Sequence, residues 1–359
     1  MFNIKKQLSK LYVSSVLGNL SLTGAWMAIL SARGFSLVEI GIAETVFHIV
    51  SLIFEIPSGV LADVFGRKKM LLVSTMMGML SDIVMILSTD FWMVCLSIGL
   101  RALCYNFSSG SGDALAYDSL KEVCQEERFE KYEANQFVIY RLCSGISTLC
   151  AGFALTIGHR LAYGTSLITA LIQIMILLSL RETCRQCEAK DLGKRLFSCF
   201  RECFGFLIKA RKCMGLMLCN SLVGAIDVLL LFFLQPRLLE SGISEFWFGP
   251  ALLFMQLGGI LGAKLIVKVP KIKYLWIFAS AMLLVTAGVV GERTGLWWMM
   301  TLGGFIAAAG DDALQVRTNA ILQDMFPSEQ RATLTSVESF SFSVIMIVLS
   351  PLAGLFFAS

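Results

Sequence analysis

Charged side chains are scarce in this sequence of 359 residues. Asp, Glu, Lys and Arg together account for 16% of it, whereas they account for about 25% of an ordinary soluble domain. Hydrophobic residues make up 56%, and the mean hydropathy is +0.74. This composition excludes a soluble protein and predicts an all-α polytopic membrane protein, since an apolar helix of about 20 residues spans a bilayer.

A disulfide framework and a cleavable leader are also lacking. The 11 cysteines are scattered through segments that we place in helices or on the cytosolic side, which argues against structural disulfides. Cys184, Cys187, Cys199 and Cys203 lie in one basic loop, but their spacing fits no common zinc module, so reduced thiols are favoured over a zinc site. No convincing cleavage site follows the first apolar run, which we therefore interpret as a retained helix.

Apolar windows predict about eleven transmembrane helices. A basic segment, residues 181–213, divides them into an N-terminal bundle of six helices (1–180) and a C-terminal bundle of five (214–359). Lys and Arg gather before the first helix and after the even-numbered ones, so the positive-inside rule places the N-terminus and the 181–213 linker in the cytosol. The linker either lies on the inner leaflet as an amphipathic helix or is a solvated connection. The windows are 11–31, 37–61, 69–88, 91–117, 136–157, 161–180, 214–235, 246–267, 273–291, 295–320 and 331–357.

The link between the second and third windows holds the most specific motif. Residues 55–69 read EIPSGVLADVFGRKK, with two glycines that allow close backbone approach and positive φ. Gly59, Asp63, Gly66, Arg67 and Lys68 match every fixed position of G-x-x-x-D-x-x-G-R-[RK], the loop signature of the major facilitator superfamily of secondary transporters. The chain thus resembles that family. The resemblance implies two pseudo-symmetric bundles of six helices, so a chain that stops at the eleventh window is expected to lack the twelfth helix.

Further stretches are similar to a subgroup of small bacterial facilitators that look like drug-efflux proteins. They are residues 34–37 (GFSL), 117–120 (YDSL) and 327–333 (PSEQRAT). The fifth helix, in contrast, lacks the Gly-x-x-x-Gly-Pro pattern of proton-coupled drug antiporters, which argues against drug antiport.

The resemblance also implies an inner gate. In the family the loop carboxylate meets the N-terminus of the eleventh helix when this gate is shut, and the loop arginine pairs with an acid at the end of the fourth helix. Asp63 and Arg67 would have these roles here, with Ser328 as the N-cap of the eleventh helix and Asp118 as the acid. The simpler alternative is that the cations only hold the loop on the cytosolic side, and both roles are compatible.

Charged residues inside apolar windows are further candidates, because each costs about 2.5–3.5 kcal/mol at the centre of a membrane helix. Glu44 and His48 are four residues apart and share one helix face, where they could hold and pass a proton. The alternative for Glu44 is a position among lipid headgroups. Arg101 cannot lose its charge and is expected at a cavity. Asp113 lies too far along the same helix to pair with it.

Three more charged residues complete this set. Arg141 either lines the pathway or extends its side chain toward the membrane surface. Asp227 lies deep in an apolar helix without a local partner, so binding of a proton or a substrate cation is favoured over a structural hydrogen bond. Asp311 and the adjacent Asp312 point about 100° apart around a helix, so at most one of them faces a cavity squarely.

We therefore expect a monomeric secondary transporter in the cytoplasmic membrane, not an enzyme. Its partners would be protons, a small molecule and the lipid bilayer, without a cofactor, a metal or nucleic acid. Efflux of an amphipathic or cationic compound is the leading hypothesis, since Glu44, Asp227 and Asp311 suit cations and the 17 methionines suit loose recognition. Uptake of a small metabolite is the alternative. A magnesium-dependent prenyl transferase is disfavoured because it needs two Asp-rich clusters, and a remnant that no longer transports is the last hypothesis.

Overall fold

The computed structural model describes residues 3–183, 201, 211–270, 272–325 and 331–359. Ser328 and the cysteines at 184, 187, 199 and 203 fall outside these residues, so what the sequence predicts for them stays a prediction. The described chain consists of α-helices, one short 3₁₀ helix and their connections. The all-α fold that the composition predicts is thus confirmed.

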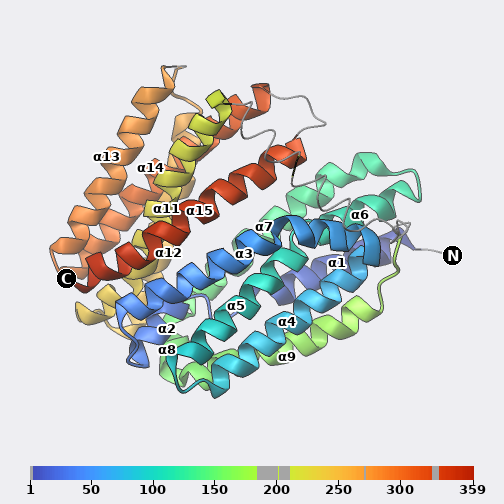
Figure 1. Cartoon of the computed structure of the whole chain (residues 1–359), viewed down its shortest axis with the longest axis horizontal. Helices are drawn as coiled ribbons and strands as arrows, with labels where there is room; N and C mark the ends of the chain where they lie inside the picture. The colour runs from blue at the N-terminus through green and yellow to red at the C-terminus, as the bar shows by residue number, and fades with distance from the viewer. Residues whose placement is uncertain (1–2, 184–200, 202–210, 271, 326–330) are drawn as a thin grey trace. The chain divides into compact units, whose positions relative to one another are not determined.

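Each of the eleven predicted windows is occupied by helix (Figure 1). Up to residue 183 the helices are α1 (Ile4–Asn19), α2 (Trp26–Ala32), α3 (Leu37–Phe65), α4 (Arg67–Leu87), α5 (Phe91–Ser108), α6 (Ser111–Lys121), the 3₁₀ helix η1 (Glu126–Arg128), α7 (Phe129–Leu149), α8 (Ala151–Ile157) and α9 (His159–Leu178). From residue 211 they are α11 (Arg211–Glu240), α12 (Glu245–Ile266), α13 (Tyr274–Arg293), α14 (Trp297–Met325) and α15 (Arg331–Ala358).

Within the described residues, eight helical segments are long and apolar enough to cross a membrane, or up to nine if the bent pair α7–α8 is one span. α5 and α6 together form one of them, although they are separate helices that meet at Gly110, where φ is +67°. Two predicted windows are not among these segments. The first is divided between α1 and α2, and α14 carries Asp311 and Asp312 among its apolar residues.

The described residues belong to two compact units. The first comprises Met1–Gly24, Val50–Cys150 and Ile157–Phe200, and the second comprises Ala25–Ile49, Ala151–Thr156 and Arg201–Ser359. The chain therefore passes from the second unit to the first within α3, after Ile49. The division into a six-helix bundle (1–180), a cytosolic linker (181–213) and a five-helix bundle (214–359) remains a prediction.

In the second unit, α3 and α15 approach each other at small residues. Gly41 lies against the backbone carbonyl of Ser350, and Gly354 lies against that of Leu37. α14 packs in the same way, because Gly258 of α12 lies against the carbonyl of Phe305. Close backbone contact at small residues is the usual way in which membrane helices gain packing energy.

In the first unit, α4 packs against both α5 and α9 (Figure 1). A core of buried side chains joins α1, α6, α7 and α9 near it; this core contains Leu8, Leu11, Leu115, Leu120, Tyr132 and Leu177.

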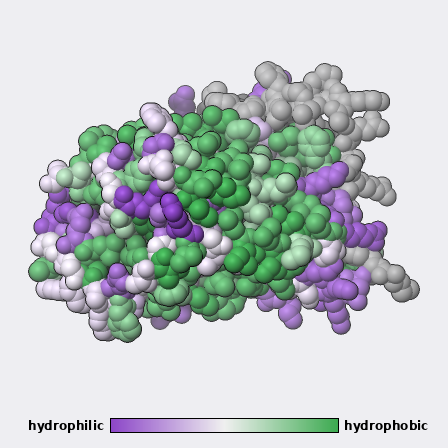
Figure 2. Space-filling view, turned by 90° about the horizontal axis from the view of Figure 1, so that it is seen from below, coloured by the Kyte–Doolittle hydropathy of each residue, from purple (hydrophilic) through white to green (hydrophobic). Residues whose placement is uncertain are grey.

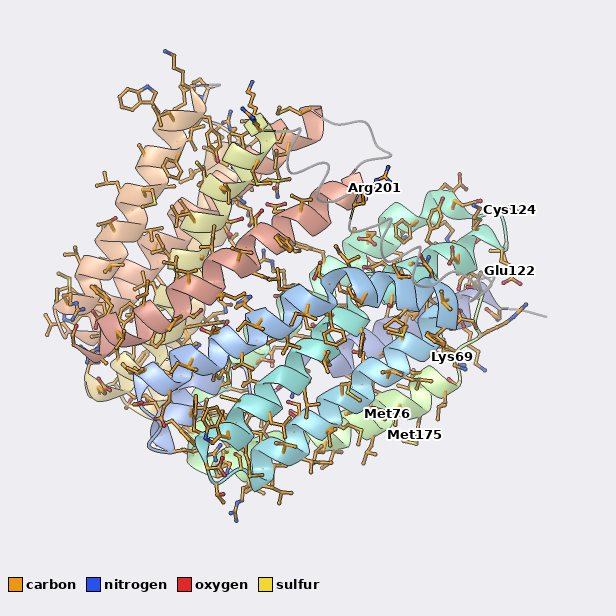
Figure 3. The ribbon with its side chains drawn as sticks, in the orientation of Figure 1. Lys69, Met76, Glu122, Cys124, Met175 and Arg201 are labelled. Atoms are coloured by element: carbon orange, nitrogen blue, oxygen red, sulfur yellow. The ribbon has the colours of Figure 1, made fainter. Side chains whose placement is uncertain are left out.

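Large apolar side chains are also exposed on the outside of the helices. The face drawn in Figure 2 is largely hydrophobic, with hydrophilic residues in separate patches. Met76 and Met175, labelled in Figure 3, are both exposed on α4 and α9. Lys69, Glu122 and Cys124 lie toward the same end of the first unit in this view. An apolar exterior with charged residues at a helix end suits a bilayer.

Candidate functional site

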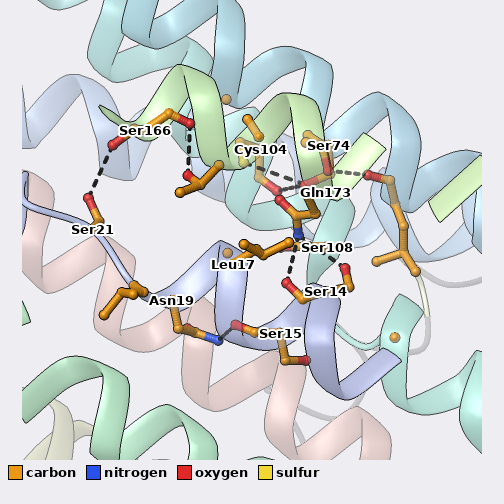
Figure 4. A pocket seen from close by; sticks show the side chains of 18 of the residues that line it. Ser14, Ser15, Leu17, Asn19, Ser21, Ser74, Cys104, Ser108, Ser166 and Gln173 are labelled. Carbon is orange, nitrogen blue, oxygen red and sulfur yellow. Dashed lines mark hydrogen bonds between the residues drawn. The ribbon is translucent and has the colours of Figure 1, made fainter. Parts of the chain in front are cut away.

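A cavity of about 370 Å³ lies inside the first unit (Figure 4). Residues of α1, α4, α5, α6, α7 and α9 line it, together with the residues that follow α1. Its wall is rich in hydroxyl and amide groups, those of Ser14, Asn19, Ser21, Ser74, Thr75, Ser108, Gln136, Tyr140, Ser166, Thr169 and Gln173. Such groups are costly inside a membrane unless they bind one another, water or a ligand.

An ion pair lies in the wall of this cavity. Arg101 of α5 donates a hydrogen bond from Nη2 to Oδ1 of Asp82 of α4. The side chain of Arg101 is 37% exposed, whereas that of Asp82 is only 3% exposed. The prediction that Arg101 lies at a cavity therefore agrees with this geometry, but its partner was missed. The signal for Asp82 was present, because it is a carboxylate within the apolar window 69–88.

Serine side chains hold α4 and α5 together close to this pair. The hydroxyls of Ser81 and Ser97 each donate to the other's backbone carbonyl, at 2.8 and 2.9 Å. Ser74 donates to the carbonyl of Cys104 at 2.6 Å. On α5, Arg101 thus lies between these two interhelical contacts, and on α4 Asp82 directly follows Ser81.

Amide side chains of α1 and α9 form another part of the cavity wall. Gln173 donates from Nε2 to the carbonyl and the hydroxyl of Ser14, at 3.1 and 3.2 Å (Figure 4). Asn19 donates to the carbonyl of Ser15 at 2.8 Å. Because a carbonyl only accepts, the orientation of both amides is defined.

Two predicted pathway residues differ in their relation to the cavity. Asp113 of α6 lines it and is exposed. Arg141 of α7 is also exposed but is not part of the cavity wall; its guanidinium lies 5.1 Å from the ring centre of Phe137. Asp113 and Arg101 lie on separate helices because the chain breaks at Gly110.

In the second unit, Glu44 and His48 form a buried pair on α3. His48 Nε2 lies 3.2 Å from Glu44 Oε1, and the other ring nitrogen, Nδ1, lies 3.5 Å from the hydroxyl of Ser343 on α15. The ring also packs against Phe47 and Phe342. This arrangement links a carboxylate, an imidazole and a hydroxyl in one line, as a proton relay requires.

Three carboxylates come together elsewhere in the second unit. Asp227 of α11 is buried, and Asp311 and Asp312 of α14 act on it electrostatically. Among the described residues, Oδ1 of Asp227 has no hydrogen-bond partner. Gly224, one turn before Asp227, leaves space for Asp311, since an added Cβ there would lie 3.3 Å from Asp311 Oδ1.

The signature loop is shorter than the apolar windows suggest. α3 and α4 are joined by the single residue Gly66, which has φ +98°, a conformation that favours glycine. Gly59 uses neither of the two properties that a glycine allows: its φ is not positive, because it lies within α3, and an added Cβ would meet no atom within 4 Å.

Arg67 joins the two acids that the resemblance associates with this loop. Its Nη2 lies 3.3 Å from Asp63 Oδ1, and its Nε lies 3.2 Å from Asp118 Oδ2. Lys68 donates from Nζ to the carbonyl of Leu178 at 2.7 Å, which ties α4 to the end of α9. The role of these contacts in gating stays a prediction.

Solved structures of transporters resemble the whole chain. A bacterial homologue of the iron transporter ferroportin, in an inward-facing state, has a TM-score of 0.72 at 12% identity over 99% of this chain and 92% of that chain. The nucleoside transporter NupG, as a mutant, has a TM-score of 0.71 at 14% identity over 99% and 96% of the two chains. A D-xylose–proton symporter has a TM-score of 0.65 at 13% identity over 96% and 87%. At these identities the likeness shows the fold alone.

A comparison with curated protein sequences gives no match. The family model of the Major Facilitator Superfamily, however, matches residues 11–295, which is well over half of the chain. This match and the common fold exclude the prenyl transferase as an interpretation. The chain belongs to the major facilitator superfamily and is a membrane transporter rather than an enzyme.

Proposed function

We propose that this protein is a proton-coupled secondary transporter that carries a small polar molecule through the cavity of the first unit by alternating access. The observation that carries the proposal is the polar cavity with the Arg101–Asp82 pair in its wall, inside a bundle of membrane helices. A site of this kind is costly unless it serves transport. Proton coupling is also supported by the symporter of the same fold.

Two kinds of solute are supported by different observations. The acidic residues Glu44, Asp227 and Asp311 support the predicted efflux of an amphipathic or cationic compound. The hydroxyl and amide groups of the cavity wall support uptake of a small polar metabolite. The geometry of the cavity favours the polar metabolite, because an amphipathic compound would leave many of these groups without hydrogen bonds.

The proton pathway that we propose includes Glu44 and His48 on α3 and the carboxyls of Asp227 and Asp311. Each of these side chains can bind a proton, and all lie within helices of the membrane fold. The loop contacts of Asp63, Arg67 and Asp118 would act at the inner gate, as would the N-cap predicted at Ser328.

We also propose a monomer in the cytoplasmic membrane with a cytosolic N-terminus, because Lys and Arg gather at that side. Cys124 is exposed in the link after α6, on the predicted cytosolic side. In a variant with no other cysteine, a membrane-impermeant maleimide should label Cys124 only after the membrane is opened. Thr89→Cys in the same background, between α4 and α5, should be labelled in intact cells. The reverse labelling pattern would show that the orientation in the membrane is opposite to the one proposed.

Transport itself is tested with purified protein in proteoliposomes under an imposed pH gradient, with a panel of polar metabolites and amphipathic cations. We expect accumulation of a polar solute that depends on the gradient and is lost in Arg101→Gln. Arg160→Gln, which removes an exposed arginine at the start of α9, is the matched control and should transport normally. Accumulation of amphipathic cations alone would support efflux instead, and equal transport by Arg101→Gln would exclude the cavity as the route.

A further inference from the structure

Arg101 presents unused hydrogen-bond donors to the cavity. A guanidinium carries five N–H donors, and in the described part of the chain this one makes a single hydrogen bond, to Asp82. Both side chains line the cavity, and Asp82 is almost fully buried, whereas the side chain of Arg101 is 37% exposed. A planar guanidinium in this position can bind a carboxylate through two parallel hydrogen bonds.

Two amide side chains in the wall of the same cavity offer acceptors. The NH₂ groups of Asn19 and Gln173 are engaged with backbone carbonyls of α1. Their amide oxygens accept no hydrogen bond from any residue that the structure describes, and both side chains line the cavity. A ligand that reaches from Arg101 to these oxygens is therefore bound best if its far end carries a hydroxyl or an ammonium group.

The charge balance decides what must bind together with such a ligand. Arg101 and Asp82 form a neutral pair, so a carboxylate added to Arg101 would leave a net negative charge inside the membrane, which is expensive. A proton on Asp82 restores neutrality and releases the guanidinium to the ligand. Around the pair and the cavity, Asp113 adds a further negative charge, and so does Glu133 of α7, which acts electrostatically on Asp113 and Tyr132. The remaining ionisable side chains are neutral in their usual forms; they are Cys104 on α5, Tyr163 on α9, and Tyr132 and Tyr140 on α7.

Resting on the transport function proposed above, we propose that the cavity binds a small carboxylate together with one proton, the carboxylate on Arg101 and the proton on Asp82. The proton comes from water on the side where the ligand enters and forms an O–H bond with Asp82. That bond breaks when the ligand leaves on the other side, and the proton returns to water. Asp82 is thus the proton-binding residue of the substrate site.

The ligand class is tested by thermal unfolding of the purified protein in detergent. The probes are lactate and alanine, each paired with its uncharged or cationic amide, lactamide and alaninamide, and inorganic phosphate. We expect a carboxylate probe to raise the unfolding temperature more than its amide does, and more than phosphate does. Arg101→Gln should abolish this shift and Arg160→Gln should retain it.

If no carboxylate stabilises the protein more than its amide, the inference is wrong, whereas Arg101-dependent transport of another solute would still support the proposed function. Stabilisation by phosphate as strong as that by carboxylates would assign the site to oxyanions in general and overturn the carboxylate assignment.

The proton is tested with a pH indicator in weakly buffered detergent solution. Binding of the stabilising carboxylate should remove about one proton per ligand from solution in the wild-type protein and none in Asp82→Asn, because binding and protonation are linked. Asp90→Asn, at the exposed N-cap of α5 and outside the cavity wall, is the control and should keep the uptake. If the wild-type protein takes up no proton on binding, the proton assignment is wrong, even if Asp82→Asn does not fold. If proton uptake persists in a folded Asp82→Asn variant, the proton must be assigned to another group.

Discussion

His48 Nε2 lies 3.2 Å from Oε1 of Glu44, one turn earlier on α3, and both side chains are buried. The imidazole reaches Ser343 of α15 on its other side, at 3.5 Å. Two polar side chains thus satisfy each other in apolar surroundings, so removal of either one leaves the other without its partner.

A double-mutant cycle measures this dependence. We expect Glu44→Leu and His48→Leu each to destabilise the protein by about 1–3 kcal/mol, since an unsatisfied buried polar group remains. The double variant should lose clearly less than the sum. Thermal unfolding in detergent gives the three values, and Ser343→Ala, which removes only a long contact, serves as the control. Additive losses would mean that the pair contributes only packing.

Gly78 of α4 makes room for the ion pair in the cavity wall. An added Cβ there would lie 3.1 Å from Cys104 Sγ and 3.5 Å from Arg101 Nη1. We expect Gly78→Val to displace the guanidinium and to reduce transport about tenfold or more, as small misplacements of a binding group do. Gly164→Val on α9 is the matched control, because a Cβ at Gly164 meets nothing within 4 Å. Equal losses of flux in the two variants would refute this role.

Arg237, near the end of α11, binds two carboxylates, of which one is buried and the other is exposed to solvent. Its Nε donates to Glu292, which is fully buried, and its Nη1 donates to Glu240, whose side chain is 51% exposed, both at 2.7 Å. Loss of one partner of a buried pair costs about 3–5 kcal/mol, whereas an exposed pair is worth at most about 1 kcal/mol. We expect Glu292→Gln to lower the unfolding temperature strongly and Glu240→Gln to lower it little. Similar shifts would show that water reaches Glu292.

The local features of this molecule could be predicted from the sequence. The apolar windows located the helices, and spacing along one helix brought Glu44 next to His48. The family resemblance brought Arg67 to Asp118, which no spacing rule predicts. These predictions succeeded because each depended on a short stretch or on a known motif.

The cavity could be predicted only in part. Arg101 was placed at a cavity because a guanidinium stays charged, but its partner Asp82 comes from another helix, and the packing of α4 on α5 decides the pairing. Applying to Asp82 the argument made for Asp227 would have identified it. The amide wall formed by Gln173 and Asn19 carried no signal, since polar uncharged side chains in a membrane helix are too common to be diagnostic.

Asp227 is the residue at which a second protonation is most directly tested. It is 4% exposed, and its Oδ1 has no hydrogen-bond partner in the described chain. The carboxyl groups of Asp311 and Asp312 interact electrostatically with it. Three carboxylates cannot all stay charged at low cost in apolar surroundings, so a proton held among them in one state of the cycle can be released in the other.

Asp227→Asn keeps the shape of the side chain and removes the titrating group. We expect this variant to preserve exchange of substrate at equal concentrations on the two sides, and proton uptake on binding, but to accumulate less substrate in a pH gradient. Asp90→Asn, which keeps the N-cap of α5 at an exposed position, is the control and should accumulate normally. If Asp227→Asn reaches the wild-type accumulation at the wild-type rate, Asp227 is structural, and coupling must reside in Asp82 or in Glu44.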